Sequence, residues 1–246
     1  MRRMQGFTLL EMAVTLAIVG ILLGGLLLTL GAQQEITRER QTRILLVQAR
    51  DALYGFAMQN GRLPCPANVG AASTGLERAP TATGCTGGAA AVHGVLPWAT
   101  LGLPEGDDWG RRFTYSVTAE FARTASTSPA RTPAQFACAT APASAPTQSA
   151  FALCTPGTIN VGRLGGNPSL IANAPAVVVS HGPNGLGGRS VGGGAIPNST
   201  NTDEQENSDA DFVFRDDVRT DTYDDMVEWL VPAILMQRMV QAGRLP

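Results

Sequence analysis

The sequence contains no lysine: all 18 of its basic residues are arginine, set against 20 acidic residues. Without lysine, a phosphate-binding P-loop lysine, a Schiff-base lysine and a lysine general base are excluded. Only two histidines occur, His93 and His181, whereas catalysis needs a nucleophile, a base and an orienting group together. We therefore predict that the chain is not an enzyme. A formal net charge of −2 gives no indication of nucleic-acid binding.

Cysteine is also scarce, and no two cysteines are spaced as C-x-x-C. With only two histidines available, this disfavours a zinc site. Four cysteines allow three connectivities. We prefer the sequential pairing, because it closes two short loops: Cys65 with Cys85 and Cys138 with Cys154. Such bonds persist in oxidising compartments.

What is abundant is an apolar run near the N-terminus, residues 12–32, which has no charged residue. About 20 such residues are long enough to cross a bilayer. Arg2 and Arg3 precede the run, and the positive-inside rule then keeps the leader cytoplasmic and the rest of the chain across the membrane. Glu11 stands at the start of the run, where a charge needs a partner.

The segment that leads into this run, Gly6-Phe7-Thr8-Leu9-Leu10-Glu11, resembles the signal of type IV pilins and type II secretion pseudopilins. The resemblance implies that a prepilin peptidase/methyltransferase cleaves after Gly6 and methylates Phe7. It also implies that Glu11 meets the N-terminal amine of an adjacent subunit in a filament. Phe7 and Glu11 are four residues apart, so they share one helix face. The alternatives are a plain signal anchor with a chance motif, and a glutamate that snorkels to the lipid interface.

The helix is predicted to continue beyond the apolar run. No proline occurs between Gln33 and Asn60, and an apolar stripe follows Ile36, Ile44, Val47, Leu53 and Phe56. Asn60-Gly61 followed by Pro64 predicts its end. The predicted boundaries are a leader at 1–6, a transmembrane helix at 7–32, its extracytoplasmic continuation at 33–61 and a globular domain at 62–246. Roughly 200 residues are enough for one domain with its own core.

Three strands are predicted in the globular part. Phe113, Tyr115 and Val117 alternate as in a half-buried strand, and residues 107–117 also resemble a strand entry of major pseudopilins. Ala174–Val179 and Phe212–Phe214 are the others. A helix that Pro232 kinks is predicted from about Tyr223, and His181 is predicted to be a surface residue beside a turn. The expected fold is α+β and pilin-like, a long N-terminal helix packed on a small antiparallel sheet with long disulfide-stapled loops.

An acidic loop covers residues 198–211 and contains five carboxylates: Asp203, Glu204, Glu206, Asp209 and Asp211. Calcium takes six to eight oxygen ligands, and such a loop supplies several of them. Major pseudopilins bind calcium in a late loop, so the resemblance suggests Ca²⁺ here. The glycine and the terminal glutamate of an EF-hand are absent. The alternative is a solvated acidic loop.

The resemblance implies a structural subunit, either a minor pilin or a pseudopilin, of a type IV pilus or a type II secretion filament. Its partners would be other pilin subunits, the peptidase and the inner membrane, which it would cross once with its C-terminal domain outside the cytoplasm until assembly extracts it. A globular part larger than that of a typical major pilin favours a minor subunit. The alternatives are a pilus-tip adhesin or DNA-uptake subunit, and a membrane-anchored enzyme with an open metal site at 203–211.

Overall fold

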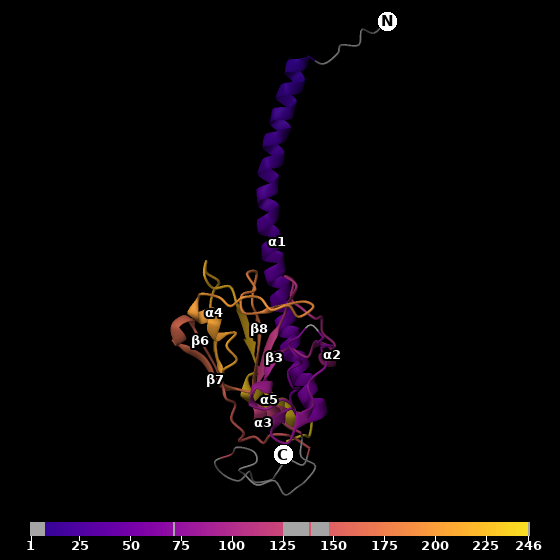
Figure 1. The fold of residues 1–246 in the computed structure, drawn as a ribbon, viewed down its shortest axis with the longest axis vertical. Coiled ribbons are helices and arrows are strands. Elements are labelled where there is room, and N and C mark those ends of the chain that lie inside the picture. The colour runs from indigo at the N-terminus through magenta and orange to yellow at the C-terminus, as the bar shows by residue number, and fades with distance from the viewer. Residues whose placement is uncertain (1–7, 71, 125–137, 139–147, 246) are drawn as a thin grey trace. The chain divides into compact units, whose positions relative to one another are not determined.

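The chain divides into two units, Met1–Arg40 and Gln41–Pro246 (Figure 1). The computed structural model describes residues 8–70, 72–124, 138 and 148–245, without the side chains at 23–30. The predicted leader 1–6, with Gly6, and the residue Phe7 lie outside the described residues.

Helix α1 (Leu9–Asn60) runs through both units without a proline. It begins after Thr8, whose Oγ1 accepts a hydrogen bond from the backbone N–H of Glu11 at 3.2 Å, as an N-capping threonine does. It ends at Gly61, whose positive φ of 69° is typical of a helix C-terminus and whose N–H donates to the carbonyl of Ala57. The predicted end of the helix is thus confirmed.

In the first unit the described apolar side chains are exposed, among them Leu9 and Ile21. Within the described part of the chain, no helical stretch has both the length and the apolarity that crossing a membrane requires. The span predicted at 7–32 includes Phe7 and the side chains at 23–30, which are not described.

The second unit buries one face of the α1 segment that belongs to it. Leu46, Ala49, Leu53 and Ala57 lie in the main core, spaced by three or four residues. The apolar stripe predicted from the sequence was therefore largely wrong. Of the predicted stripe, Leu53 is buried, but the buried side chains beside it were not part of the prediction. Two predicted stripe residues of this unit, Ile44 and Val47, are exposed.

A four-stranded antiparallel sheet faces this segment of α1. Its order is β11 (Met226–Trp229), β8 (Ala176–Ser180), β5 (Thr114–Val117) and β3 (His93–Val95). A second sheet joins β10 (Val213–Arg215), β6 (Ile159–Gly162) and β7 (Ser169–Ala174), and β10 runs parallel to β6. Two small pairs complete the strands: β1 (Pro80–Thr81) with β2 (Gly84–Cys85), and β4 (Arg111–Arg112) with β9 (Arg189–Ser190). The α+β class is confirmed, with several small sheets in place of one.

The predicted strand Ala174–Val179 is divided. Pro175, which has no N–H to donate to a ladder, separates β7 from β8, and the two strands belong to different sheets. β8 is buried on both faces, because Val178 packs in the main core while Val177 and Val179 pack in a second core with residues of β6 and β10.

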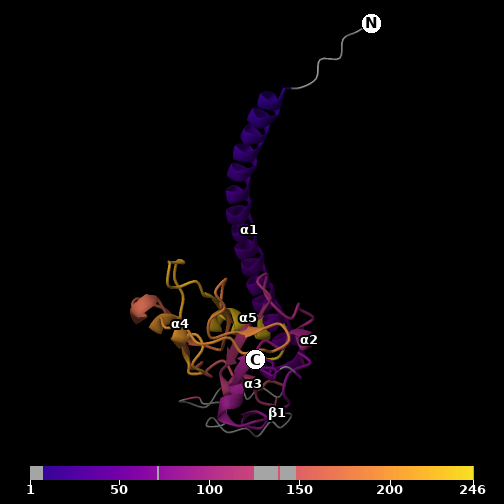
Figure 2. The same cartoon turned by 45° about the horizontal axis from the view of Figure 1, so that its top comes forward.

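In the described residues the remaining helices are short. They are η1 (Ala89–Val92), α2 (Trp98–Leu101), α3 (Ala119–Ala122), η3 (Leu164–Gly166), α4 (Thr202–Glu206) and α5 (Pro232–Gln241). In both views α4 and α2 lie on opposite sides of the second unit (Figure 1 and Figure 2).

The helix predicted from about Tyr223 was wrong in its first part. Residues 226–229 form β11, which pairs with β8, and the helix begins only at Pro232. Proline fits the first turn of a helix because its missing N–H would have no intrahelical partner there. Pro232 therefore starts α5 and does not kink it.

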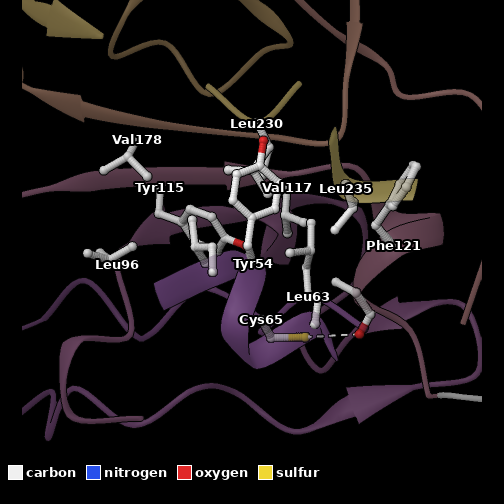
Figure 3. Packing of buried hydrophobic residues seen from close by; sticks show 14 of the residues in the cluster. Tyr54, Leu63, Cys65, Leu96, Tyr115, Val117, Phe121, Val178, Leu230 and Leu235 are labelled. Atoms are coloured by element: carbon white, nitrogen blue, oxygen red, sulfur yellow. Dashed lines mark hydrogen bonds between the residues drawn. The ribbon is translucent and has the colours of Figure 1, made fainter. Parts of the chain in front are cut away.

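The main core lies between α1, the four-stranded sheet and α5 (Figure 3). Its largest fully buried side chains include Tyr54, Tyr115, Phe121 and Leu235. The buried tyrosine hydroxyls are paired: Tyr115 donates to the carbonyl of Pro64, and Tyr54 accepts from the N–H of Val231. Each aromatic ring thus stays in the apolar core while its polar atom is satisfied.

Two disulfides join Cys65 to Cys85 and Cys138 to Cys154. This is the sequential pairing favoured from the sequence. Cys65 is buried in the main core just after the end of α1 (Figure 3). Its partner, Cys85, lies on β2. The first bond therefore ties the exit from the long helix to the β1–β2 hairpin.

Candidate functional sites

The first candidate site is the N-terminal motif. Glu11 lies in the first turn of α1, where its side chain is exposed and its N–H is held by the hydroxyl of Thr8. A carboxylate in a first helical turn is favoured by the positive end of the helix dipole. The partner predicted for Glu11, the amine of Phe7, lies outside the described residues.

The second candidate site was predicted at the five acidic residues 203–211, and the structure distributes them over three places. Asp203 Oδ1 accepts from the N–H of Gly165 at 2.8 Å and lies 3.4 Å from Arg215 Nε. Asp203 is therefore held by a structural ion pair, and the other four acids separate into an outer and an inner group.

The outer group, the exposed acidic triplet, consists of Glu206, Asp209 and Asp211, whose carboxylate oxygens lie within 4.8 Å of one another. Burial is the main cause that raises the pKa of Glu206 and of Asp209, and the charge of Asp211 adds to it in both. Arg215, 3.6 Å from Glu206, opposes the shift of that residue.

The inner group is a buried acidic triplet of Glu204, Asp224 and Asp225, which are 1 %, 9 % and 2 % exposed. Their carboxylate oxygens also lie within 4.8 Å of one another. Only Glu204 was among the predicted ligands. Asp224 and Asp225 come from the segment just before β11, some twenty residues further along the chain.

The fold holds this triplet through polar partners on several elements. Asn201 caps α4 and so directs Glu204 inward, with its Oδ1 accepting from the N–H groups of Asp203 and Glu204. Glu204 Oε1 accepts from Asn184 Nδ2 at 3.1 Å and from the N–H of Asp224 at 3.0 Å.

Each aspartate of the triplet has one satisfied oxygen. Asp224 Oδ2 accepts from the N–H of Asn184, and Asp225 Oδ2 accepts from Asn207 Nδ2 at 2.8 Å. Their other oxygens, Asp224 Oδ1 and Asp225 Oδ1, are buried without a hydrogen-bond partner among the described residues. Buried unpaired carboxylate oxygens are costly, so they point to a missing ligand or proton.

His181 adjoins the buried acidic triplet, and its predicted place at the surface was wrong. The side chain is fully buried, with Nε2 at 2.8 Å from Thr114 Oγ1 and Nδ1 at 3.6 Å from Asp225 Oδ1. The turn after β8 folds over the ring: a Cβ added to Gly188 would lie 2.8 Å from His181 Cδ2, so only glycine fits there.

The electrostatics of the triplet let Asp224 keep its proton to a higher pH than an ordinary aspartate when no cation is present. Burial, and then the negative charges of Glu204 and Asp225, raise the pKa of Asp224 to about 6. Burial and the charge of Asp225 likewise raise the pKa of Tyr223. A divalent cation would replace that proton, because metal ligands bind in their ionised form. A set of carboxylate oxygens suits a hard cation such as Ca²⁺ or Mg²⁺.

One signal in the sequence points to the missed ligands. Asp224-Asp225 stands between Tyr223 and Met226-Val227, so two acids directly precede an apolar strand and follow an aromatic residue. Charged residues are almost never fully buried unless they are paired. Adjacent carboxylates inside an apolar segment therefore favour a site over a solvated turn.

Residues 1–27 match the family model of the prokaryotic N-terminal methylation motif, which is the signature of type IV pilins and pseudopilins. The motif supports a pilin-like or pseudopilin-like protein, and it implies processing by prepilin peptidase and assembly with other pilin subunits. No curated protein and no solved structure matches the chain.

Proposed function

We propose that the chain is a structural subunit, either a minor pilin or a pseudopilin, of a type IV pilus or type II secretion filament. The observation that carries the proposal is the methylation motif at residues 1–27, with Glu11 in the first turn of a long helix. In this proposal the peptidase cleaves after Gly6, and the methylated Phe7 becomes the new N-terminus.

Charge pairing drives the proposed assembly. Cleavage after Gly6 creates an ammonium group on Phe7, four residues before Glu11. A carboxylate surrounded by apolar helices is strongly destabilised when it has no partner and tolerated when it is paired. The amine of a neighbouring subunit supplies the partner. Pairing with this amine fixes where each new subunit docks along the filament.

The exposed apolar side chains of the first unit support the same proposal. Leu9, Leu10, Leu16 and Ile21 are all more than half exposed in the single chain. Exposed apolar surface of this extent marks contact with lipid or with other chains. We propose that residues 7–32 lie in the inner membrane before assembly and in the filament core afterwards.

We place the second unit outside the cytoplasm, where its two disulfides persist. The proposed role there is to face outward from the filament. The pilin-type motif favours this structural role over an enzymatic one.

Replacement of Glu11 tests the proposal. Glu11→Ala is expected to abolish or strongly reduce incorporation into filaments in the native host, while cleavage after Gly6, followed by mass spectrometry of the N-terminus, still occurs. Glu120→Ala on α3 is the matched control and should assemble normally. Undiminished incorporation of Glu11→Ala, or a mature chain that keeps residues 1–6, would contradict the proposal.

We also propose that the buried acidic triplet binds Ca²⁺, which moves the site predicted at 203–211 to Glu204, Asp224 and Asp225. The unpaired buried oxygens of both aspartates support the inner position. The exposed acidic triplet has no comparable deficit, because Asp209 and Asp211 are exposed to solvent and no oxygen of this triplet is buried without a partner among the described residues.

The calcium site is tested by the melting temperature of the full-length protein in detergent, with calcium and with EDTA. At a calcium concentration 100 times Kd, binding should raise Tm by about 5–10 °C. Asp224→Asn should remove most of this response, whereas Asp209→Asn in the exposed triplet and Asp221→Asn nearby should retain it. Equal melting temperatures of the wild type in calcium and EDTA would refute the site, and loss of the response in Asp209→Asn alone would place it at the outer triplet.

A further inference from the structure

A cavity of about 210 Å³ opens on the face of β3 and β5 that lies opposite the main core. Its lining includes His93, Thr114, Ser116, Arg189, Asn207 and Phe214. Side chains from β3, β5, β9 and β10 and from the loop after α4 thus converge on one hollow. The three acids of the buried acidic triplet do not line it, although Asn207, which donates to Asp225, belongs to both surroundings.

Arg189 brings an unpaired positive charge to this cavity. In the part of the chain that the structure describes, its guanidinium has no hydrogen bond and no ion pair. Its partner across the β4–β9 ladder, Arg112, is by contrast engaged by Glu105 at 2.6 Å. A guanidinium is always charged and offers a planar fork of donors. The fork is therefore available to a ligand.

His93 supplies a second available donor or acceptor. Its Nδ1 lies 2.8 Å from Ser116 Oγ, and its ring is tilted against Phe212 with centroids 4.8 Å apart. Nε2 has no partner among the residues that the structure covers. Burial lowers the pKa of His93, Arg78 adds to this, and Asp211 opposes it. The ring is therefore neutral at neutral pH.

A second cation, Arg78, supports the floor of the cavity. Arg78 donates to the carbonyls of Ala67, Ala91 and His93, all neutral acceptors. Gly94 permits this approach, because a Cβ there would lie 2.6 Å from the Arg78 guanidinium. Among the described residues no carboxylate pairs with Arg78, so its positive charge is held behind β3 by neutral acceptors.

The rim of the cavity carries the opposite charge. Ala210 belongs to the lining, and its neighbours Asp209 and Asp211 are members of the exposed acidic triplet. This rim disfavours a dianion such as phosphate and tolerates a single negative charge held by the arginine fork. Where the ligand also has an ammonium group beside its acid, the rim attracts it.

We propose that this cavity binds the carboxylate of an amino acid or of a peptide C-terminus between Arg189 and His93. The two sources share the planar carboxylate that a guanidinium fork binds in bidentate fashion. They differ at the nitrogen, which is a charged amine in the free amino acid and a neutral amide in the peptide.

Of the two histidines in the chain, His93 lines the cavity, whereas His181 is fully buried with its Nε2 at Thr114, so the ring signal of ¹³C-labelled His93 reports on the cavity. The full-length protein in detergent is titrated with N-acetylglycine, glycine and glycinamide, which lacks the carboxylate. We expect a saturable shift of the His93 signal with at least one of the two acids and none with glycinamide. A stronger response to glycine identifies a free amino acid, and a stronger response to N-acetylglycine identifies a peptide C-terminus.

Arg189→Gln should weaken the binding about 10-fold or more, and Arg40→Gln in the first unit should leave it unchanged. The proposal is overturned if glycinamide shifts His93 equally, if Arg189→Gln binds like the wild type, or if neither acid gives a saturable shift at probe concentrations well above about 1 mM.

Discussion

A single carboxylate, Asp107, organises the entry to the central sheet. Its Oδ1 accepts from the N–H groups of Trp109 and Arg111, and its Oδ2 accepts from Ser180 Oγ at 2.7 Å. These bonds close the turn at Gly110, where φ is 75°, and join the segment before β5 to the end of β8. Asp107, the first residue of the segment 107–117 singled out in the sequence, thus fixes a turn, as Asx turns do.

Burial nevertheless raises the pKa of Asp107, although Ser180 and the two N–H groups oppose the shift. The folded state therefore holds the proton at a higher pH than the unfolded state does. The stabilising contribution of the protonated group is complete below the unfolded pKa of about 3.9 and is lost as the pH rises through the folded pKa.

Because the pKa of Asp107 is raised in the folded state, the effect of Asp107→Asn on stability should depend on pH. It is measured as Tm in EDTA from about pH 4 to about pH 7. Asparagine keeps the acceptor and cannot ionise, so the difference between the Tm of the variant and that of the wild type should shift in favour of the variant as the pH rises. Ser73→Ala, a surface change, should follow the wild type at each pH. A difference that is constant, or that shifts in favour of the wild type, would show that Asp107 does not titrate in this way.

At the scale of elements, the local sequence pattern predicted the strand at residues 176–180 better than the C-terminal elements. Val177-Val178-Val179 is a short apolar run of the kind found in strands buried on both faces, and β8 is such a strand. Residues 226–241 were harder, because Met226, Val227 and Trp229 suit a helix as well as a strand. Pairing with β8, more than forty residues earlier in the chain, selects the strand.

The helix α1 illustrates the same limit. Its length, its capping threonine and its glycine end follow from local residues. The face that the second unit buries does not, since leucine, isoleucine and valine lie all around this segment of the helix. Contact with the sheet and α5 selects Leu46, Leu53 and Tyr54 and leaves Ile44 exposed.

At the scale of the whole molecule, all three hydrophobic clusters of the described residues lie within residues 41–246. A unit with its own core is expected to fold independently. The first unit has no buried side chain among its described residues and so adds little to that core.

We predict that a fragment of residues 41–246 folds with a Tm within about 4 °C of the full-length protein, a difference of roughly 1 kcal/mol. Circular dichroism in the same detergent measures it. Leu53→Ala in the fragment should cost about 2–5 kcal/mol, because it leaves a cavity in the main core. A fragment without a cooperative transition would show that residues 1–40 are needed for folding.

The sequence by itself determined the features that depend on neighbouring residues: the methylation motif, the end of α1 at Gly61, the strand around Tyr115 and the preference for sequential disulfides. Only the tertiary structure decided which acids share a site, because Glu204 meets Asp224 and Asp225 through the packing of α4 against the segment before β11. It also decided that His181 is buried beside them. Burial and charge proximity arise from contacts between distant segments, and a local pattern of residue types does not contain them.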